Sequence, residues 1–478
     1  MKILYVSSEV APFIKTGGLA DVAGSLPNAI GKPSQDVRVV LPLYSLIKDK
    51  YITDIKFEKY YFVDLGWRRQ YVGVFSLKKG NVTYYFLDNE YYFKRSNIYG
   101  EYDDGERFIY FQKAVVCLLK EINFKAHIVH CNDWHTGLIP LYIKDFAKGD
   151  NFYSDMKSVY TIHNIKYQGI FPDFILWEIG GLSGEYANYD GLRHSHDTIN
   201  FMKAGIVYSD AFTTVSKSYA QEIKTPEYSE GLDQCIKNHS YKLHGIVNGI
   251  DYEIFNPETD VNLKEYYNID TIDKKTNNKL EIQRLYNLPV DEDIPMIAMI
   301  TRLADLKGID LVTYILEGLL QKENIQFVLL GTGEKKYEDS FKYFQSKYPN
   351  KLASRNYFDE GESHLLYAAA DMLLMPSLAE PCGISQLIAL RYGTIPIVRE
   401  TGGLKDTIEP YNIMTNEGNG FGFRNKDAGE LLDAIKKALN MIKDEEKWNT
   451  IMKSAMNSKN DWQKSSEEYL KLYEGLRL

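Results

Sequence analysis

Short apolar runs alternate along the chain with polar loops and with stretches whose apolar positions recur at helical spacing. Residues 2–6 form one such run, residues 20–30 have helical spacing, and residues 37–41 form the next run. A short apolar run predicts a strand buried on both faces of a parallel sheet, and the helical stretches predict the cover of that sheet. Comparable runs occupy residues 127–130, 158–161, 211–215, 295–300, 326–330, 371–375 and 394–398. The pattern therefore predicts an α/β fold.

The first half also contains stretches that depart from this alternation. Residues 60–63, 71–77 and 82–87 predict further strands, partly antiparallel. Residues 106–121 predict an amphipathic helix, because their apolar positions fall on one helical face. Residues 91–102 are aromatic and charged and predict a loop.

The chain of 478 residues is long enough for two or three domains. We expect a first domain over residues 1–245 and a second over 246–455, which restarts the strand pattern. A closing helix in residues 456–478 would pack back across the seam between the two domains. The polar stretch 273–281 is expected to be a surface excursion of the second domain.

A turn with paired glycines, Lys15-Thr16-Gly17-Gly18-Leu19, lies between the first predicted strand and the first predicted helix. This arrangement directs backbone N–H groups and a positive helix end toward an anion. The glycines permit close approach of a ligand to the backbone, and Lys15 adds a positive charge. An ordinary strand-to-helix turn is the alternative, and a Gly-Gly pair alone would favour it.

The sequence Thr-Gly-Gly-Leu occurs a second time, at residues 401–404, again after an apolar run. An Asp lies two residues beyond the Leu in both copies, Asp21 and Asp406. Two such turns, far apart in the chain, suggest two similar halves that face one ligand.

Composition narrows the class of protein. The net charge is −9, from 56 basic and 65 acidic residues, which argues against a nucleic-acid-binding protein. No apolar run approaches the length of a membrane span, and Met1-Lys2 leads into a strand rather than a signal peptide. The cysteines are scattered and predict neither a zinc site nor a disulfide framework, so we expect a reducing cytoplasm. They are Cys117, Cys131, Cys235 and Cys382.

Two loops of the second half carry candidate chemistry. Arg302 and Lys307 flank a loop directly after a predicted strand and would together neutralise a departing diphosphate. Solvated surface charges are the alternative. Glu380 precedes Cys382 and Gly383 between a buried strand and a helical stretch. Its carboxylate would hold sugar hydroxyls, or it would simply cap a helix.

Histidines and carboxylates of the first half lie at predicted strand ends. They are His130, Asp133, His135 and His163. Zinc is the less favoured interpretation, because no close pair of ligands shares one helix. A polar wall for a sugar is favoured, in which His163 and Asn164 contact hydroxyls while Asp133 and His135 support them.

Taken together, these motifs resemble those of the bacterial glycogen synthases, of the family that includes the plant starch synthases. The matching motifs run in order over nearly the whole chain. They are residues 8–12, 15–21, 133–135, 161–164, 167–169, 200–205, 213–216, 248–251, 302–303, 307–308, 376–377, 380–383 and 401–404.

The resemblance implies two Rossmann-like domains facing a central cleft, the GT-B type of glycosyltransferase fold. It implies transfer of glucose from ADP-glucose to the non-reducing 4-OH of an α-1,4-glucan, with retention of configuration and without metal or cofactor. ADP-glucose and glycogen or maltodextrin are the implied partners, with no nucleic acid and no membrane. The oligomeric state is left open.

The resemblance also implies roles for individual residues. Glu380, His163, Arg302 and Lys307 match the catalytic positions, with Glu380 the essential acid. Phe358 matches the aromatic position that stacks the adenine. The positions around donor and acceptor are Lys15, Gly17, Gly18, Asp21, Asp133, His135, Asn164, Asn248, Cys382 and Gly383.

Two departures from the family pattern bear on the donor. Ser377-Leu378-Ala379 precedes Glu380 where Ser-Arg-Phe is more usual, so the wall beside Glu380 is smaller. Related transferases that use UDP-sugars carry a second Glu eight positions after the first, where this chain has Ile388. A UDP-sugar transferase of the same architecture and an inactive glucan-binding protein are the alternatives.

Overall fold

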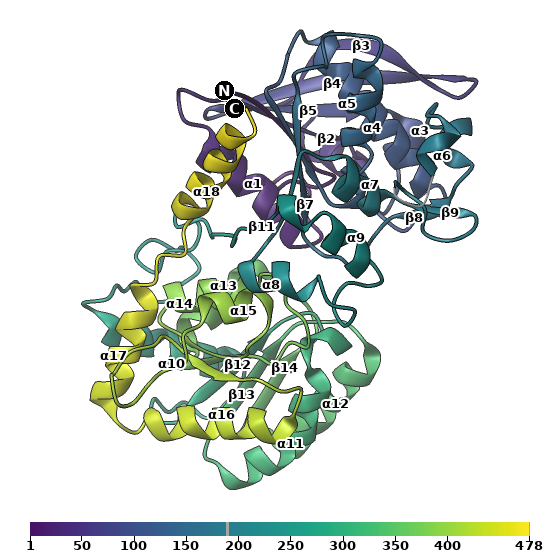
Figure 1. Cartoon of the computed structure of the whole chain (residues 1–478). Helices are drawn as coiled ribbons and strands as arrows, with labels where there is room; N and C mark the ends of the chain where they lie inside the picture. The colour runs from purple at the N-terminus through teal and green to yellow at the C-terminus, as the bar shows by residue number, and fades with distance from the viewer. Residues whose placement is uncertain (188–190, 478) are drawn as a thin grey trace. The chain divides into compact units, whose positions relative to one another are not determined.

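The computed structural model describes residues 1–187 and 191–477. The chain divides into two compact units, which are drawn in Figure 1. The N-terminal unit comprises Met1–Val247 together with the segment from Trp462 onward, and the C-terminal unit comprises Asn248–Asp461. The last helix, α18 (Trp462–Gly475), thus belongs to the unit that holds the first strand.

A mixed sheet forms the centre of the N-terminal unit. Among the described residues its nine strands follow the order β11-β10-β7-β6-β1-β2-β5-β4-β3. Strands from β11 to β5 are parallel, whereas β4 and β3 continue the sheet in antiparallel fashion. The bounds are β1 Lys2–Val6, β2 Asp36–Pro42, β3 Lys56–Leu65, β4 Arg68–Lys79, β5 Val82–Asp88, β6 Ile128–Asn132, β7 Lys157–Ile162, β10 Ala211–Thr214 and β11 Leu243–Gly245. The predicted parallel sheet with antiparallel additions is confirmed.

Helices connect these strands, and a small antiparallel pair lies apart from the main sheet. The helices are α1 Gly18–Ile30, α2 Ser45–Tyr51, α3 Glu90–Phe93, α4 Asp104–Glu121, α5 Ile139–Ala147, α6 Ile175–Glu178, α7 Phe201–Tyr208, α8 Lys217–Glu222 and α9 Asp233–Asn238. The pair consists of β8 (Ile170–Pro172) and β9 (Thr198–Asn200). The expected loop at 91–102 begins inside α3, a single helical turn that starts at Glu90.

The C-terminal unit is a doubly wound Rossmann sheet. Its parallel strands follow the order β14-β13-β12-β15-β16-β17, which is 3-2-1-4-5-6 in chain order. The strands are β12 Met296–Ile300, β13 Gln326–Leu330, β14 Leu352–Arg355, β15 Met372–Met375, β16 Ile395–Arg399 and β17 Phe421–Phe423. The helices are α10 Lys275–Leu285, α11 Ile309–Lys322, α12 Lys335–Lys347, α13 Glu360–Ala369, α14 Ser385–Arg391, α15 Gly402–Thr407, α16 Ala428–Met441 and α17 Glu445–Met456.

Alternate residues of the central strand β12 supply two separate cores. Ile297 and Met299 pack with α11 and α16 on one face, and Met296, Ala298 and Ile300 pack with α10 and α13 on the other. This two-sided burial explains why the strands are continuous apolar runs rather than alternating ones. In both units the strand order reverses next to the first strand, and open α/β sheets bind ligands at the carboxyl ends of the strands there.

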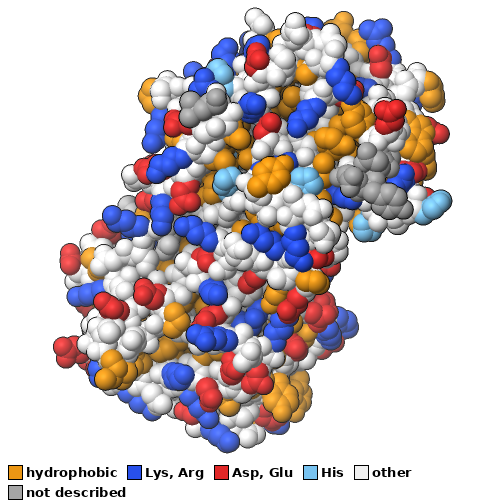
Figure 2. Space-filling model, in the orientation of Figure 1, with side chains coloured by type: hydrophobic (Ala, Val, Ile, Leu, Met, Phe, Trp, Pro, Cys, Tyr) orange, Lys and Arg blue, Asp and Glu red, His pale blue; other side chains and the backbone are white. Residues whose placement is uncertain are grey.

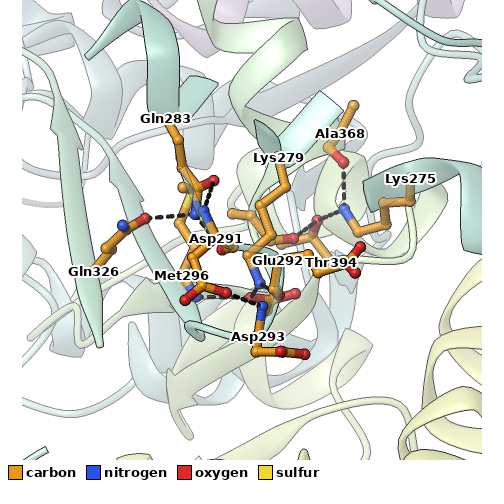
Figure 3. A network of polar contacts seen from close by, with 12 residues as sticks. Lys275, Lys279, Gln283, Asp291, Glu292, Asp293, Met296, Gln326, Ala368 and Thr394 are labelled. Carbon is orange, nitrogen blue, oxygen red and sulfur yellow. Dashed lines mark hydrogen bonds and ion pairs between the residues drawn. The ribbon is translucent and has the colours of Figure 1, made fainter. Parts of the chain in front are cut away.

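The expectation of a surface excursion at 273–281 is wrong. The segment enters α10, whose polar side chains Lys275, Lys279 and Gln283 are buried (Figure 3). Lys279 forms an ion pair with Asp371 at 2.8 Å, and Gln283 donates to the side-chain oxygen of Gln326 at 2.9 Å. A helix can therefore be anchored through a polar face when each buried group finds a partner.

Lys275 donates a hydrogen bond to a backbone carbonyl at the C-terminal end of helix α13. Its ammonium donates to the carbonyl oxygen of Ala368 at 2.6 Å and to Oγ1 of Thr394 at 2.7 Å. Ala368 lies in the last turn of α13, where carbonyls have no partner within the helix and where a positive charge is favourable. Burial lowers the pKa of Lys275 to about 7.

We expect Lys275→Met to lower the stability of the protein by roughly 2 kcal/mol, because the α13 carbonyl would lose its buried donor. Thermal unfolding measures this as a Tm lower by several degrees. Lys274→Met is the matched control, since Lys274 is half-exposed and its ammonium pairs with the half-exposed Glu265. Equal Tm values for the two variants would contradict the anchoring role of Lys275.

Candidate active site

The candidate residues lie on loops at the carboxyl ends of parallel strands in each unit. In the N-terminal unit, the glycine turn follows β1, Asp133 follows β6 and His163 follows β7. In the C-terminal unit, Arg302 and Lys307 follow β12, and Glu380 follows β15. Polar loops at this edge of a Rossmann sheet are typical of a ligand site.

A buried carboxylate holds the glycine turn after β1. Glu9 accepts hydrogen bonds from the Thr16 backbone N–H at 2.5 Å and the Thr16 hydroxyl at 2.9 Å, and from the Gly17 N–H. Burial nevertheless raises the pKa of Glu9. Lys15, at the exposed side of the turn, forms an ion pair with Asp21 at 2.7 Å. The buried Glu9 therefore holds the backbone of the turn, while the charged side chain of Lys15 remains exposed to solvent.

The two Thr-Gly-Gly-Leu copies differ in what surrounds their glycines. Gly17 has extended backbone with φ −161°, and a Cβ placed there would meet no atom within 4 Å. Gly402 has φ +46°, and a Cβ there would lie 1.9 Å from the carbonyl oxygen of Glu380. The first copy leaves space for a ligand, whereas the second packs against the Glu380 loop.

Asp133 and Asn132 hold His163 from two sides. The Asp133 carboxylate accepts from the His163 backbone N–H at 2.8 Å, and His163 Nε2 lies 2.9 Å from Oδ1 of Asn132. Burial raises the pKa of Asp133 to about 7 and lowers the pKa of His163 to about 3. His163 is therefore neutral near pH 7 and suits hydrogen bonding to a neutral hydroxyl.

His135, which is expected to support the sugar-binding residues, packs among aromatic rings. Its ring lies among those of Tyr99, Phe108 and Trp134, at centroid distances of 4.4, 4.7 and 4.0 Å. Neither ring nitrogen has a hydrogen-bond partner among the described residues. Burial lowers the pKa of His135 well below its usual value, so the ring packs as a neutral aromatic group.

Asn164 and His130 also make contacts within the protein. The Asn164 side-chain oxygen accepts from the Lys166 backbone N–H at 3.1 Å, inside its own turn. Both ring nitrogens of His130 are engaged, with the Tyr473 hydroxyl of α18 and the Thr161 hydroxyl, each at 2.6 Å. His130 thus links α18 to the sheet through both ring nitrogens.

In the C-terminal unit, an ion pair joins two of the expected catalytic residues. Lys307 Nζ lies 2.5 Å from Oε2 of Glu380, which also accepts from the Ser377 hydroxyl at 2.9 Å. The buried Arg399 donates to the Ser377 carbonyl at 2.8 Å and so anchors this loop. Glu380 is no helix cap, because α14 begins at Ser385. Arg302 is exposed on the same loop as Lys307, directly after β12.

The remaining candidates of this unit have different surroundings. Asn248 is buried, and its backbone N–H donates to the sulfur of Cys382, whose pKa burial raises to about 12. Gly383 has φ +75° beside the Gln386 side chain. Phe358 is 61% exposed on the loop between β14 and α13, so its ring face is open to a ligand.

Charged side chains of both signs occupy the face drawn in Figure 2. On the face in Figure 2, Lys and Arg side chains are interspersed with Asp and Glu. An anionic ligand must therefore be attracted by local groups such as Lys15, Arg302 and Lys307. In the described part of the chain, no helix combines the length and apolar character that a bilayer crossing requires.

Sequence reasoning did not assign roles to Glu9 and Asn132. Both are buried. Glu9 bonds Thr16 in the turn that follows it, and Asn132 bonds His163 in the turn after the neighbouring strand β7. Glu9 lies within the matched motif of residues 8–12, which is the one signal that points to it. A polar residue at the last position of a buried strand is the corresponding signal for Asn132.

Two family models match successive parts of the chain. The starch synthase catalytic domain matches residues 2–238, and the glycosyl transferases group 1 model matches residues 286–454. With a doubly wound sheet in the C-terminal unit and a similar strand order in the N-terminal one, these matches define a glycosyltransferase of the GT-B fold class.

The chain belongs to the glycogen and starch synthase family. It is 52% identical to a glycogen synthase of Finegoldia magna over 474 residues, with 99% of both chains covered. It is 50% identical to that of Clostridium acetobutylicum over 475 residues, again with 99% of both covered. The catalytic domain of starch synthase IV from Arabidopsis thaliana, bound to ADP and acarbose, matches with TM-score 0.92 at 32% identity over 99% of both chains.

We predict that Gly17→Ser lowers the rate of glucosyl transfer at least tenfold, since the added side chain would occupy the open space above the turn. Stability should change by no more than about 0.5 kcal/mol, because Ser is a favourable helix N-cap and fits extended backbone. Steady-state kinetics and thermal unfolding measure the two effects. Gly402→Ser is the control and should lower Tm instead. A Gly17→Ser enzyme with unchanged kinetics would mean that no ligand approaches this turn.

Proposed function

We propose that the protein is an ADP-glucose-dependent α-1,4-glucan synthase. It transfers glucose to the non-reducing 4-OH of glycogen or a maltodextrin, with retention of configuration, in the cytoplasm. The observation that carries this proposal is the part-buried Lys307–Glu380 pair at the carboxyl end of the Rossmann strands. Membership of the glycogen synthase family and the ADP-bound starch synthase support it.

The charges of the C-terminal unit suit the breaking bond. As the glucosyl bond to ADP lengthens, negative charge grows on the diphosphate and positive charge on the sugar ring. Lys307 and Arg302 would meet the phosphate oxygens, and Glu380 would hold sugar hydroxyls beside them. A diphosphate would compete with Glu380 for Lys307, so donor binding would free that carboxylate to contact the sugar. The loss of one such preorganised charge typically raises the barrier by roughly 3–4 kcal/mol.

The N-terminal unit supplies complementary donors. Lys15 and the backbone N–H of Gly18, at the start of α1, suit an anion. His163, held neutral by burial, suits a sugar hydroxyl. Phe358 in the C-terminal unit would stack the adenine ring through its open face.

A UDP-sugar transferase of the same architecture is the second candidate. The observation against it is Ile388, which takes the place of the second acid of that group. Ile388 is 5% exposed and packs into the core of the C-terminal unit, so no carboxylate is available at this position. A catalytically inactive glucan-binding protein is opposed by the presence of Lys307 and Glu380 as an ordered pair.

We expect ADP release and elongation of a short maltodextrin when the purified protein is incubated with ADP-glucose. UDP-glucose, tested in parallel, should give a much lower kcat/KM. Faster transfer from UDP-glucose would overturn the donor assignment. No transfer from either nucleotide would support the inactive glucan-binding alternative.

We further expect Glu380→Gln and Lys307→Met each to lower kcat by roughly 10²–10³-fold, because each removes a charge aimed at the reacting groups. Lys335→Met is the control, since Lys335 forms an exposed ion pair with Asp339 in the same unit. Circular dichroism and Tm report folding. If the first two variants lose stability in proportion to their activity, the pair is structural.

A further inference from the structure

We infer that Asn132 is a positioning residue that fixes His163 as the Nε2–H tautomer, so that Nδ1 of His163 accepts a hydrogen bond from a substrate hydroxyl. The inference deepens the proposed function and depends on it for the identity of the substrate. The arrangement of the protein groups does not depend on it, because all of them lie in the N-terminal unit.

The orientation of the Asn132 amide is determined by a backbone carbonyl. Asn132 is fully buried at the end of β6, and its Nδ2 donates to the carbonyl oxygen of Val6 on the neighbouring strand β1 at 2.9 Å. A carbonyl oxygen only accepts hydrogen bonds, so the flipped amide would place two oxygens against each other. Oδ1 of Asn132 therefore faces the opposite side.

Two groups approach that amide oxygen. The Tyr5 hydroxyl donates to Oδ1 of Asn132 at 3.0 Å, and His163 Nε2 lies 2.9 Å from the same atom. Since an amide oxygen cannot donate, Nε2 of His163 must carry the proton. The Val6 carbonyl thus determines the orientation of the Asn132 amide, and the amide oxygen determines the tautomer of His163.

The charge state completes the assignment. Burial lowers the pKa of His163 to about 3, so the ring is neutral near pH 7 and carries one proton only. With that proton on Nε2, the other nitrogen, Nδ1, is an acceptor. It has no hydrogen-bond partner among the described residues. A ligand group at Nδ1 must therefore donate, as a sugar hydroxyl does and an ionised phosphate oxygen does not.

Two adjacent residues at the end of β6, Asn132 and Asp133, contact different parts of His163. Asn132 determines the protonation of the ring, and Asp133 accepts from the His163 backbone N–H at 2.8 Å. Strands β6 and β7 are paired in parallel register, with Asn132 opposite Thr161. This pairing places Asn132 and Asp133 beside the start of the turn that carries His163. Ring and backbone are thus held independently.

The tautomer can be measured directly by long-range ¹H–¹⁵N correlation spectra of the full-length protein labelled with ¹⁵N-histidine. The His163 signals are those lost in His163→Gln. We expect the Nε2–H pattern in the wild type and in Tyr5→Phe, which removes the other donor to the same oxygen. Asn132→Leu should populate the Nδ1–H form. An Nδ1–H pattern or a charged ring in the wild type near pH 7 would overturn the inference.

Kinetics tests whether Asn132 acts through His163. Asn132→Leu should lower kcat/KM about tenfold, the effect of one hydrogen bond, while Tyr5→Phe should change it less than twofold. Adding Asn132→Leu to His163→Ala should cause no further loss. Independent, multiplicative losses would show that Asn132 acts elsewhere and would overturn the positioning role.

The two hypotheses fail in different ways. If no nucleotide-sugar supports transfer, the proposed function fails while the spectrum of the free protein still reports the tautomer. If transfer occurs and the wild-type spectrum shows Nδ1–H, the inference fails and the function stands. The wild-type spectrum also decides the tautomer should Asn132→Leu fail to fold, as judged from its Tm.

Discussion

Hydrogen bonds to buried carboxylate and amide oxygens hold the loops that follow the parallel strands, and the rest of the N-terminal site depends on them. Glu9 holds the Thr16 N–H, Asp133 holds the His163 N–H, and Asn132 holds the His163 ring. A buried polar group without a partner is costly, so each of these bonds has few alternatives. The loops are therefore preorganised before any ligand arrives, which is the condition for effective electrostatic stabilisation.

In the C-terminal unit, the buried polar groups of the site are charged, and they too need partners. Glu380 is nearly buried, and its carboxylate is compensated by Lys307 and Ser377. A buried charge that loses its partner is strongly destabilising, so this pair must either stay closed or exchange one partner for a ligand of like charge. Under the proposed function, diphosphate would be such a ligand for Lys307, and sugar hydroxyls would suit the released Glu380. The resting ion pair keeps both charges compensated until a ligand replaces one partner.

The sequence predicts the fold where burial is apolar and fails where burial is polar. Continuous apolar runs located β1, β12 and the strands beside them correctly. The polar stretch 273–281 predicts a surface excursion where the structure has α10, because the buried face of this helix includes the polar residues Lys275, Lys279 and Gln283. The surroundings of His135 were equally unpredictable, since the rings that enclose it come from residues 99 and 108 as well as its neighbour. Only the tertiary fold brings such partners together.

The repeated Thr-Gly-Gly-Leu sequence shows why a motif does not determine its own role. Both copies begin a helix after a parallel strand, as the pattern predicts. At Gly17 the space that a side chain would take is open, whereas at Gly402 the Glu380 backbone fills it. The same local sequence therefore offers backbone to a ligand in one unit and supports an acidic loop in the other. What occupies the space beside a glycine, rather than the glycine itself, decides between binding and packing.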